Sequence, residues 1–247
     1  GSFHHRGYRT ETNAAPLNEV LAAGMVLLSD WNKRSPLVDP FCGSGTILTE
    51  AAMIAANIPP NIHRAQFGFQ RWNDFNADLY ETIFNGAVDK IIDERPILWG
   101  CDINGVTVGK AKETLRNAKL DDVVTIRHCA FADLEPPPDG AGTLIFNPPY
   151  GERMDERGIN SPSDDESINA MYKMIGDTLK HNWPGWTAWI LTSNMEAAKY
   201  IKLTPKPKIQ LFNGALDCRF LRYEIYAGSR RLTPHPNDPD HQNSERD

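Results

Sequence analysis

The apolar positions of the chain recur with two spacings that alternate along most of its length. Short runs rich in branched and aromatic residues predict buried strands, and segments with apolar residues three or four positions apart predict amphipathic helices. The predicted strands cover residues 37–38, 97–102, 123–127, 142–146, 186–191, 209–212 and 220–226. The predicted helices cover residues 13–28, 75–93 and 168–179, and two more begin at Thr46 and after Asp102.

Strands that alternate with helices and end in two consecutive strands predict an α/β fold. The expected architecture is a doubly wound, mostly parallel sheet with a terminal antiparallel hairpin. Ligands of such sheets bind at the carboxyl ends of the strands, near the switch in strand order. Asp39, Asp102, Asp133 and Asn147 each lie at or just past the end of a predicted strand. We therefore expect these four side chains to form a site at one edge of the sheet.

Breaks in this pattern divide the chain. Residues 1–30 form an N-terminal arm and helix, and residues 31–227 form the main domain. The Ile58-Pro59-Pro60 break and the long gap before the next strand mark residues 57–96 as an insertion. Residues 228–247 are polar and contain several prolines, so this tail is predicted to be disordered.

The segment from Val38 to Thr46 predicts a strand, a glycine turn and the start of a helix. Gly43 and Gly45 allow the backbone to approach a ligand closely, and the helix start offers unpaired N–H groups. The segment has no Gly-Lys-Ser/Thr of a P-loop, and Leu48 stands where the dinucleotide fingerprint needs a third glycine. A cofactor loop is the functional interpretation, and the motif alone leaves a simple tight turn as the alternative.

The sequence Asn147-Pro148-Pro149-Tyr150 follows the fourth predicted strand. An exocyclic amine of a base is a weak nucleophile because its lone pair is delocalised into the ring. The Asn147 side-chain oxygen and the Pro148 carbonyl could accept hydrogen bonds from such an amine and direct its lone pair towards a methyl donor. Tyr150 offers a face on which an unpaired base can stack. A proline turn after a strand is the structural alternative.

Two further segments mix basic and aromatic residues. Near the N-terminus, Arg6, Tyr8 and Arg9 either contact an anionic substrate or belong to a solvated arm. In the insertion, His63 and Arg64 are candidates for substrate contact. Three aromatic residues of the insertion are expected instead to pack it onto the domain: Phe67, Phe69 and Trp72.

Charge and cysteine content limit the function classes. With Lys+Arg 26 and Asp+Glu 32 the net charge is −6, so any nucleic-acid binding must come from a local basic patch or another domain. The four cysteines show no metal-binding spacing, and no metal is expected. Because no apolar run approaches the length of a membrane helix and no signal peptide is visible, we expect a cytoplasmic protein without a membrane partner.

The motifs together resemble the THUMP-associated class I methyltransferases, over roughly residues 3–227. The most similar branch is the bacterial 23S ribosomal RNA guanine-N2 methyltransferases, often labelled N6-adenine-specific DNA methylases. The segments that carry the resemblance are His5-Arg6-Gly7-Tyr8-Arg9, Ala15-Pro16-Leu17, residues 39–46, Ile62-His63-Arg64, residues 147–153 and Leu216-Asp217-Cys218. The resemblance implies a Rossmann-like fold with S-adenosylmethionine as cofactor and S-adenosylhomocysteine as product.

The resemblance also implies roles for single residues. Gly43, Ser44 and Gly45 would pass under the methionine part of the cofactor, and Asp39 would hold its amino end. Asp102 would bind the ribose hydroxyls, Ile103 would belong to the same cofactor site, and Asp133 would contact the adenine. The residues implied for catalysis and substrate binding are Asn147, Pro148, Tyr150 and Arg153. The family usually has an N-terminal THUMP domain that binds RNA, so this chain is expected to be a fragment of a longer protein.

The expected reaction is methylation of the N2 amine of a guanine in large-subunit ribosomal RNA. The Asn-Pro-Pro-Tyr motif also resembles that of adenine-N6 methyltransferases acting on DNA or RNA and of glutamine-amide protein methyltransferases. A domain that docks RNA without catalysis is a further alternative. The sequence leaves the target nucleotide, the oligomeric state and the role of the insertion open.

Overall fold

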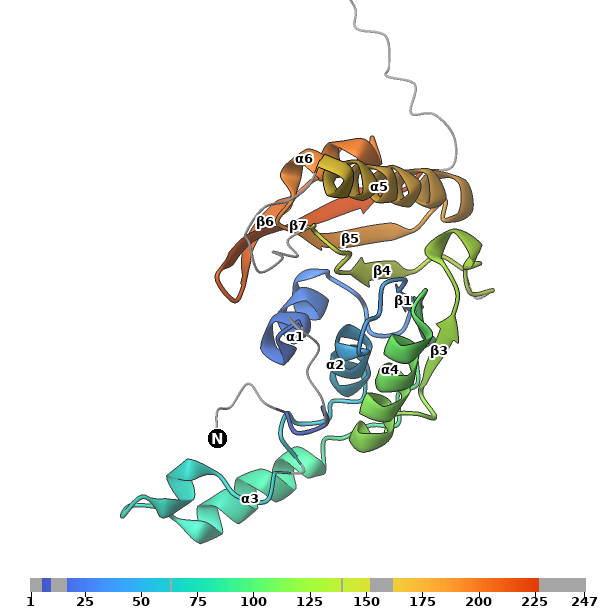
Figure 1. The fold of residues 1–247 in the computed structure, drawn as a ribbon. Helices are drawn as coiled ribbons and strands as arrows, with labels where there is room; N and C mark the ends of the chain where they lie inside the picture. The colour runs from blue at the N-terminus through green and yellow to red at the C-terminus, as the bar shows by residue number, and fades with distance from the viewer. Residues whose placement is uncertain (1–5, 10–16, 63, 139, 152–161, 227–247) are drawn as a thin grey trace, which may run out of the picture.

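A computed structural model describes residues 6–9, 17–62, 64–138, 140–151 and 162–226 (Figure 1). Its centre is a seven-stranded sheet with the order β3-β2-β1-β4-β5-β7-β6. Strands β1 to β5 pair in parallel, and β7 runs antiparallel to both β5 and β6, which confirms the predicted fold class. The strands are β1 (Leu37–Asp39), β2 (Leu98–Asp102), β3 (Val124–His128), β4 (Thr143–Phe146), β5 (Thr187–Thr192), β6 (Lys208–Asn213) and β7 (Leu216–Glu224).

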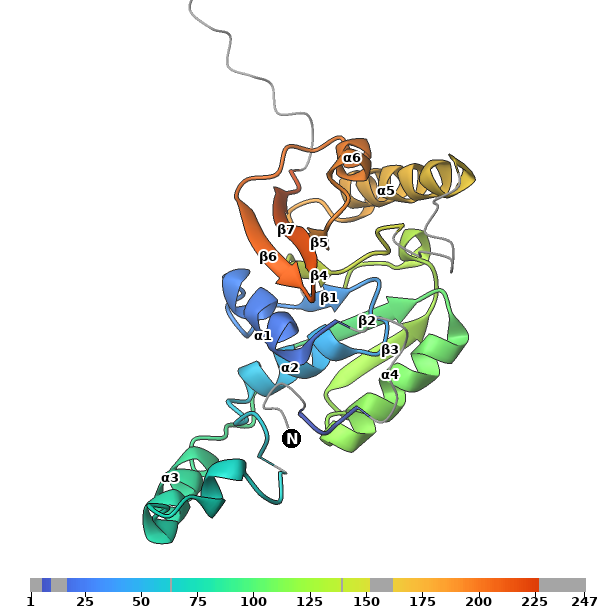
Figure 2. The ribbon, with the colours of Figure 1, turned by 60° about the vertical axis from the view of Figure 1, so that its left-hand side comes forward.

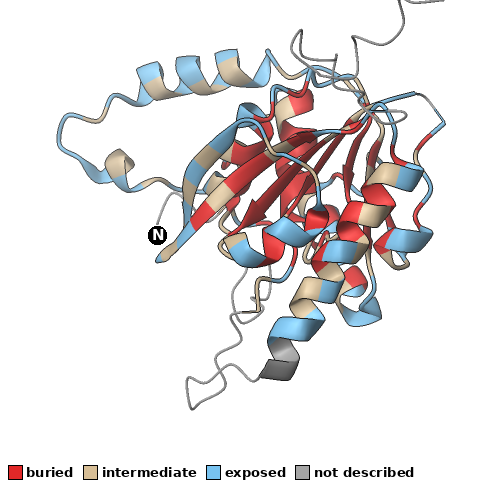
Figure 3. Cartoon of the chain, turned by 90° about the horizontal axis from the view of Figure 1, so that it is seen from above, coloured by how far each residue is buried: buried red, intermediate tan, exposed pale blue. Residues whose placement is uncertain are grey.

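Helices cover both faces of the sheet, and each face has its own hydrophobic core. One core contains α1 (Glu19–Leu28), α2 (Thr46–Ala55) and α4 (Gly105–Ala118). The other contains α5 (Pro162–Asn182), α6 (Met195–Ala198) and the short 3-10 helices η2 (Phe131–Asp133) and η3 (Lys199–Ile201). Neighbouring residues of β1 serve opposite cores, Leu37 the first and Val38 the second, because side chains alternate along a strand. Burial is therefore deepest along the central strands (Figure 3).

The structure corrects the bounds of three predicted helices. Helix α1 begins at Glu19 rather than at residue 13, because the Asn18 side-chain oxygen accepts the first N–H groups of the helix. Helix α5 covers Pro162–Asn182 instead of residues 168–179, and the helix predicted over residues 75–93 covers only Ala77–Val88.

The parallel topology brings the polar strand ends together, as predicted. Asp39 ends β1, Asp102 ends β2, and Asn147 directly follows β4. The chain leaves β1 towards β2 on one side and reaches β4 on the other, so the switch in strand order lies between β1 and β4. The carboxyl edge at this switch is the candidate site.

Residues 57–96, which we call the arm, project from the core and contain η1 (Gly68–Arg71) and α3 (Ala77–Val88) (Figures 1 and 2). The arm is closed at its base, where Asn57 Nδ2 donates to the Lys90 carbonyl and the Ile92 N–H donates to the Ala56 carbonyl, both at 2.9 Å. Neither η1 nor α3 has a buried residue. The prediction that aromatic residues pack the insertion onto the domain is therefore wrong, because their rings contact one another instead.

No helix in the described part of the chain is both long and apolar enough to cross a membrane.

Candidate cofactor and substrate site

The glycine loop between β1 and α2 has a backbone that only glycine adopts easily. Gly43 has φ +53° and Gly45 has φ +79°. The loop is fixed by two hydrogen bonds, from the Gly45 N–H to the Cys42 carbonyl at 2.7 Å and from the Cys42 N–H to the Cys101 carbonyl at 2.9 Å. The second bond attaches the loop to β2. These contacts support a preformed concave backbone at the N-terminus of α2.

Asp39 is only 1% exposed, and its Oδ1 accepts a hydrogen bond from the Phe41 N–H at 3.1 Å. Burial raises the pKa of this carboxyl well above its usual range, and the nearby charge of Asp102 raises it further. Among the described residues, no Lys or Arg forms a salt bridge with Asp39. A cationic ligand group would stabilise the ionised carboxylate, so the site fits the ammonium group of an amino acid moiety.

Asp102 joins the glycine loop to the end of β2. Its Oδ2 accepts from the Gly43 N–H at 3.2 Å and its Oδ1 accepts from the Asn104 N–H at 2.9 Å. Each carboxylate oxygen can accept a second hydrogen bond, so the side chain can bind a pair of neighbouring hydroxyls.

Two more predicted cofactor residues lie at this edge. Ile103 follows Asp102 and is 75% exposed, although it is a large apolar side chain. Such a side chain suits contact with a flat ring. Asp133 ends η2 just after β3, and it is exposed. The edge therefore has a polar and apolar rim that fits an adenosine.

Asn147 lies half-buried at the end of β4 beside the buried Pro148. The Tyr150 hydroxyl donates a hydrogen bond to Asn147 Oδ1. Burial raises the pKa of Tyr150, which keeps this hydroxyl protonated and able to donate. Asn147 Oδ1 thus serves as an acceptor in the structure, which is the property that a substrate amine would need.

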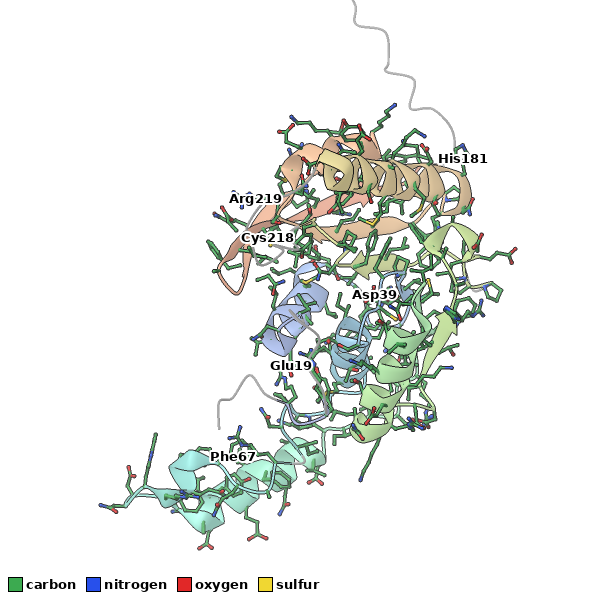
Figure 4. All side chains as sticks on the ribbon, in the orientation of Figure 1. Glu19, Asp39, Phe67, His181, Cys218 and Arg219 are labelled. Atoms are coloured by element: carbon green, nitrogen blue, oxygen red, sulfur yellow. The ribbon has the colours of Figure 1, made fainter. Side chains whose placement is uncertain are left out.

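The segment after β5 and the β6–β7 hairpin support this loop, and sequence reasoning did not assign either to the site. Asn194 Nδ2 donates to the Tyr150 carbonyl at 3.2 Å. The buried Cys218 of β7 contributes to the raised pKa of Tyr150, and Figure 4 places it in the hairpin. The signal in the sequence was the Ser193-Asn194 pair, which follows a predicted strand closely, as the other site residues do.

Residues 6–9, which we call the N-terminal strap, do not form the predicted substrate surface. The Tyr8 hydroxyl donates to Glu50 Oε1 at 2.8 Å, and Arg6 Nε lies 3.2 Å from the same oxygen. Arg9 Nη2 donates to Thr46 Oγ1 at 2.6 Å. Tyr8 is buried, and the side chains of both arginines are nearly so. This placement favours a structural role over contact with RNA.

The N-terminal strap acts on the cofactor loop through α2. Thr46 is the first residue of α2, and its Oγ1 lies 3.2 Å from Ser44 Oγ of the loop. Burial raises the pKa of Glu50, whereas the charge of Arg6 and the hydrogen bond from Tyr8 lower it. The strap therefore stabilises a buried carboxylate beneath the loop.

Of the other predicted substrate residues, the structure describes only Arg64. His63 and Arg153 lie outside the described residues. Arg64 lies on the arm, with its Cζ 5.4 Å from the centre of the Phe67 ring. Within the described ranges, no group of three or more His, Cys, Asp and Glu side chains could hold a metal ion.

The chain matches the RMKL-like methyltransferase domain family over residues 6–222. It belongs to this family. The chain is 39% identical to the ribosomal RNA large subunit methyltransferase K/L of Shewanella sp. (strain MR-4) over 242 residues, which cover 94% of this chain and 32% of that protein.

Two solved structures are similar to the whole domain. SMU.472, crystallised with S-adenosylhomocysteine, aligns with a TM-score of 0.81 and 33% identity over 92% of this chain and 57% of its own. A protein from Listeria monocytogenes (str. 4b F2365), described as a predicted N6-adenine-specific DNA methylase, aligns with a TM-score of 0.77 and 32% identity over 90% and 55%. The chain spans between a third and just over half of the length of the relatives that it matches.

Membership of this family and the fold together make the chain a class I, S-adenosylmethionine-dependent methyltransferase domain. In open α/β sheets, ligands bind outside the carboxyl ends of the strands at the switch in strand order, which is the edge described above.

Proposed function

We propose that this domain transfers the methyl group of S-adenosylmethionine to the exocyclic N2 amine of a guanine in large-subunit ribosomal RNA. The observation that carries the proposal is the match to methyltransferase K/L over 94% of the chain. The resemblance of the motifs to the guanine-N2 branch supplies the base and the atom.

The cofactor contributes an electrophilic methyl group on a sulfonium. Asn147 Oδ1 and the Pro148 carbonyl accept hydrogen bonds from the guanine amine, and the amine replaces the Tyr150 hydroxyl on Asn147. These bonds localise the nitrogen lone pair and direct it at the methyl carbon. The N–C bond forms as the S–C bond breaks, S-adenosylhomocysteine leaves, and the methylated nitrogen then loses one proton to solvent.

The glycine loop and its neighbours hold the cofactor in this proposal. Gly43, Ser44 and Gly45 line the methionine part, and Asp39 binds its ammonium group. Asp102 binds the ribose hydroxyls, and two residues contact the adenine: Ile103 and Asp133. Tyr150 stacks on the target base after giving up its bond to Asn147.

The partner of the domain is ribosomal RNA, and the relatives' greater length supports a longer protein in which a THUMP domain contributes RNA binding. A net charge of −6 leaves little general attraction for RNA, so a separate RNA-binding domain has a clear physical use. A cytoplasmic location follows from a ribosomal substrate.

The experiment measures methyl transfer from labelled cofactor to unmodified ribosomal RNA, DNA and protein in parallel, and the modified nucleoside is identified by its mass and by its chromatographic retention against standards of the isomeric methylguanosines. N2-methylguanosine in large-subunit RNA is the expected product. Labelled protein, or labelled RNA without methylguanosine, would contradict the proposed substrate. A chain that binds S-adenosylhomocysteine but transfers no methyl group is tested again as the longer protein.

Adenine-N6 methylation is the second candidate, because the similar Listeria protein is described as an N6-adenine-specific DNA methylase. Adenine N6 is also an exocyclic amine, and the same two acceptors would activate it. The mass of the product separates the candidates directly, since N6-methyladenosine and N2-methylguanosine differ.

A further inference from the structure

The tip of the arm combines an exposed indole with guanidinium groups. Trp72 is 68% exposed directly after η1, and Arg71 is the last residue of η1. Arg71 Nη2 donates to Gln66 Oε1 at 3.2 Å, and the Arg64 guanidinium lies over the Phe67 ring. Exposed aromatic and basic side chains in one place are the combination that binds single-stranded nucleic acid through base stacking and phosphate contacts.

A stack of rings holds this tip in a defined shape. The Phe69 ring lies at its centre, 5.3 Å from Phe67 and 5.9 Å from Tyr80 of α3. Trp72 meets Phe69 edge to face at 6.5 Å. The Phe67 N–H donates to Gln70 Oε1 at 2.7 Å, which closes η1. The indole therefore contacts the ring stack on one side, and most of its surface remains exposed.

Charge separates along the arm. The tip has Arg64 and Arg71 beside one exposed carboxylate, Asp74, whereas α3 has Asp78 and Glu81 and no basic residue. A polyanion is attracted to the tip and repelled by α3. This pattern fits nucleic acid better than an uncharged protein surface.

The arm carries this tip away from the sheet, on the side of α1 and α2 (Figures 1 and 2). Figure 4 shows Phe67 far from Asp39, which marks the cofactor edge. The tip is thus too remote to contact the nucleotide that is being methylated. It can reach only another part of the same large substrate.

From this placement we propose that the arm tip is a second RNA-binding site, at which Trp72 stacks on an unpaired base and Arg64 and Arg71 bind neighbouring phosphates. The inference rests on the proposed function for its RNA substrate. It extends that function by requiring an unpaired stretch of RNA at a distance from the target guanine. Stacking on an aromatic ring tolerates any base, so the tip selects RNA shape rather than sequence.

The test compares tip variants with a matched variant of the same arm. Trp72→Ala and Arg71→Ala alter the tip, and the paired substitution Leu79→Ser with Ile83→Ser removes exposed apolar side chains of α3. Affinity for a labelled fragment of large-subunit RNA is measured in a salt titration, alongside kcat, KM for RNA and affinity for S-adenosylhomocysteine.

For the tip variants we expect RNA affinity to fall about tenfold and KM for RNA to rise by the same factor, because one stacked base or one phosphate contact is lost. Arg71→Ala should also flatten the salt dependence, whereas Trp72→Ala should not. The value of kcat and the cofactor affinity should not change. Trp72→Tyr should restore most of the RNA affinity, which separates lost stacking from a disordered arm.

Three outcomes would overturn the inference. Tip variants with unchanged RNA affinity, in a chain that methylates RNA normally, would refute the arm site and leave the proposed function intact. A larger loss of RNA affinity for the Leu79 and Ile83 variant than for the tip variants would place the RNA contact on α3 and refute the tip site. A wild-type chain that neither binds nor methylates RNA would refute the proposed function, and the arm inference would fall with it.

Discussion

The carboxyl edge of the sheet and the arm both present aromatic and polar side chains, but they are built differently. At the edge, Asp102 accepts N–H groups from two separate backbone segments, and Asn194, just past the neighbouring strand β5, donates to the Tyr150 carbonyl. In the arm, Trp72 packs against Phe69, only three residues away. Geometry at the edge depends on the whole fold, whereas geometry in the arm depends on nearby sequence.

This difference predicts that substitutions in the two regions change different quantities. Edge variants should change turnover or cofactor affinity, and arm variants should change RNA affinity alone. The predictions below test this separation, beginning with the largest expected effect.

Asn147→Ala should lower kcat by on the order of 10³-fold, because it removes one preorganised acceptor for the substrate amine. Affinity for S-adenosylhomocysteine, measured by calorimetry, should stay the same, since Asn147 makes no proposed cofactor contact. Unchanged turnover would exclude Asn147 from catalysis and would contradict the expected difference between edge and arm variants.

Asp102→Ala should weaken S-adenosylhomocysteine binding by at least about tenfold, because the ribose hydroxyls lose a charged acceptor and the glycine loop loses one of its two hydrogen bonds to β2. KM for RNA should change little. Asp121→Ala is the matched control, since Asp121 is an exposed carboxylate away from the edge. An equal loss in both variants would point to a general charge effect and not to the proposed ribose contact.

Tyr8→Phe should destabilise the fold by about 2 kcal/mol, because it removes a buried hydrogen bond to the Glu50 carboxylate. Thermal unfolding should shift down by several degrees. Tyr200→Phe alters an exposed tyrosine and should shift nothing. A Tyr8→Phe variant with normal stability but weakened RNA binding would restore the substrate role that the sequence predicted for the N-terminal strap.

Cofactor affinity should rise as pH increases through the raised pKa of Asp39, the smallest of these effects. The raised pKa of Asp39 means that part of the free protein is protonated there, and a cationic ligand group binds the ionised form. Without ligand the sign is opposite, because a carboxyl with a raised folded-state pKa makes folding less favourable as pH rises through that pKa. Calorimetry on Asp39→Asn should give a flatter pH profile, and a profile as steep as that of the wild type would exclude Asp39 as its source.

The sequence predicted the fold because its information is local and periodic. Alternating strands and helices imply the parallel sheet, and a parallel sheet places Asp39, Asp102 and Asn147 at one edge whatever the details of packing. The start of α1 was also readable, since Asn18 precedes the helix with a side chain suited to capping. The predicted helix instead followed the apolar spacing and began at residue 13, on the N-terminal side of that cap.

The role of the N-terminal strap was not predictable in this way. Its partner Glu50 lies 42 residues away from Tyr8, and nothing near either residue indicates that they meet. The sequence of an aromatic and basic segment therefore does not distinguish a segment that contacts RNA from one that contacts a buried carboxylate. The same ambiguity affected the arm. Its rings were expected to contact the core, but in the structure they contact one another.

The closed base of the arm has a consequence for how such domains can diversify. The chain leaves the core at Ala56 and returns at Ile92, and a backbone hydrogen bond joins these two residues. Since α3 and η1 contribute no buried residue, a short turn could replace these two helices without removing a buried side chain. Relatives could therefore carry a different insertion at this point, and contact a different part of a substrate or a different substrate, while retaining the same catalytic domain.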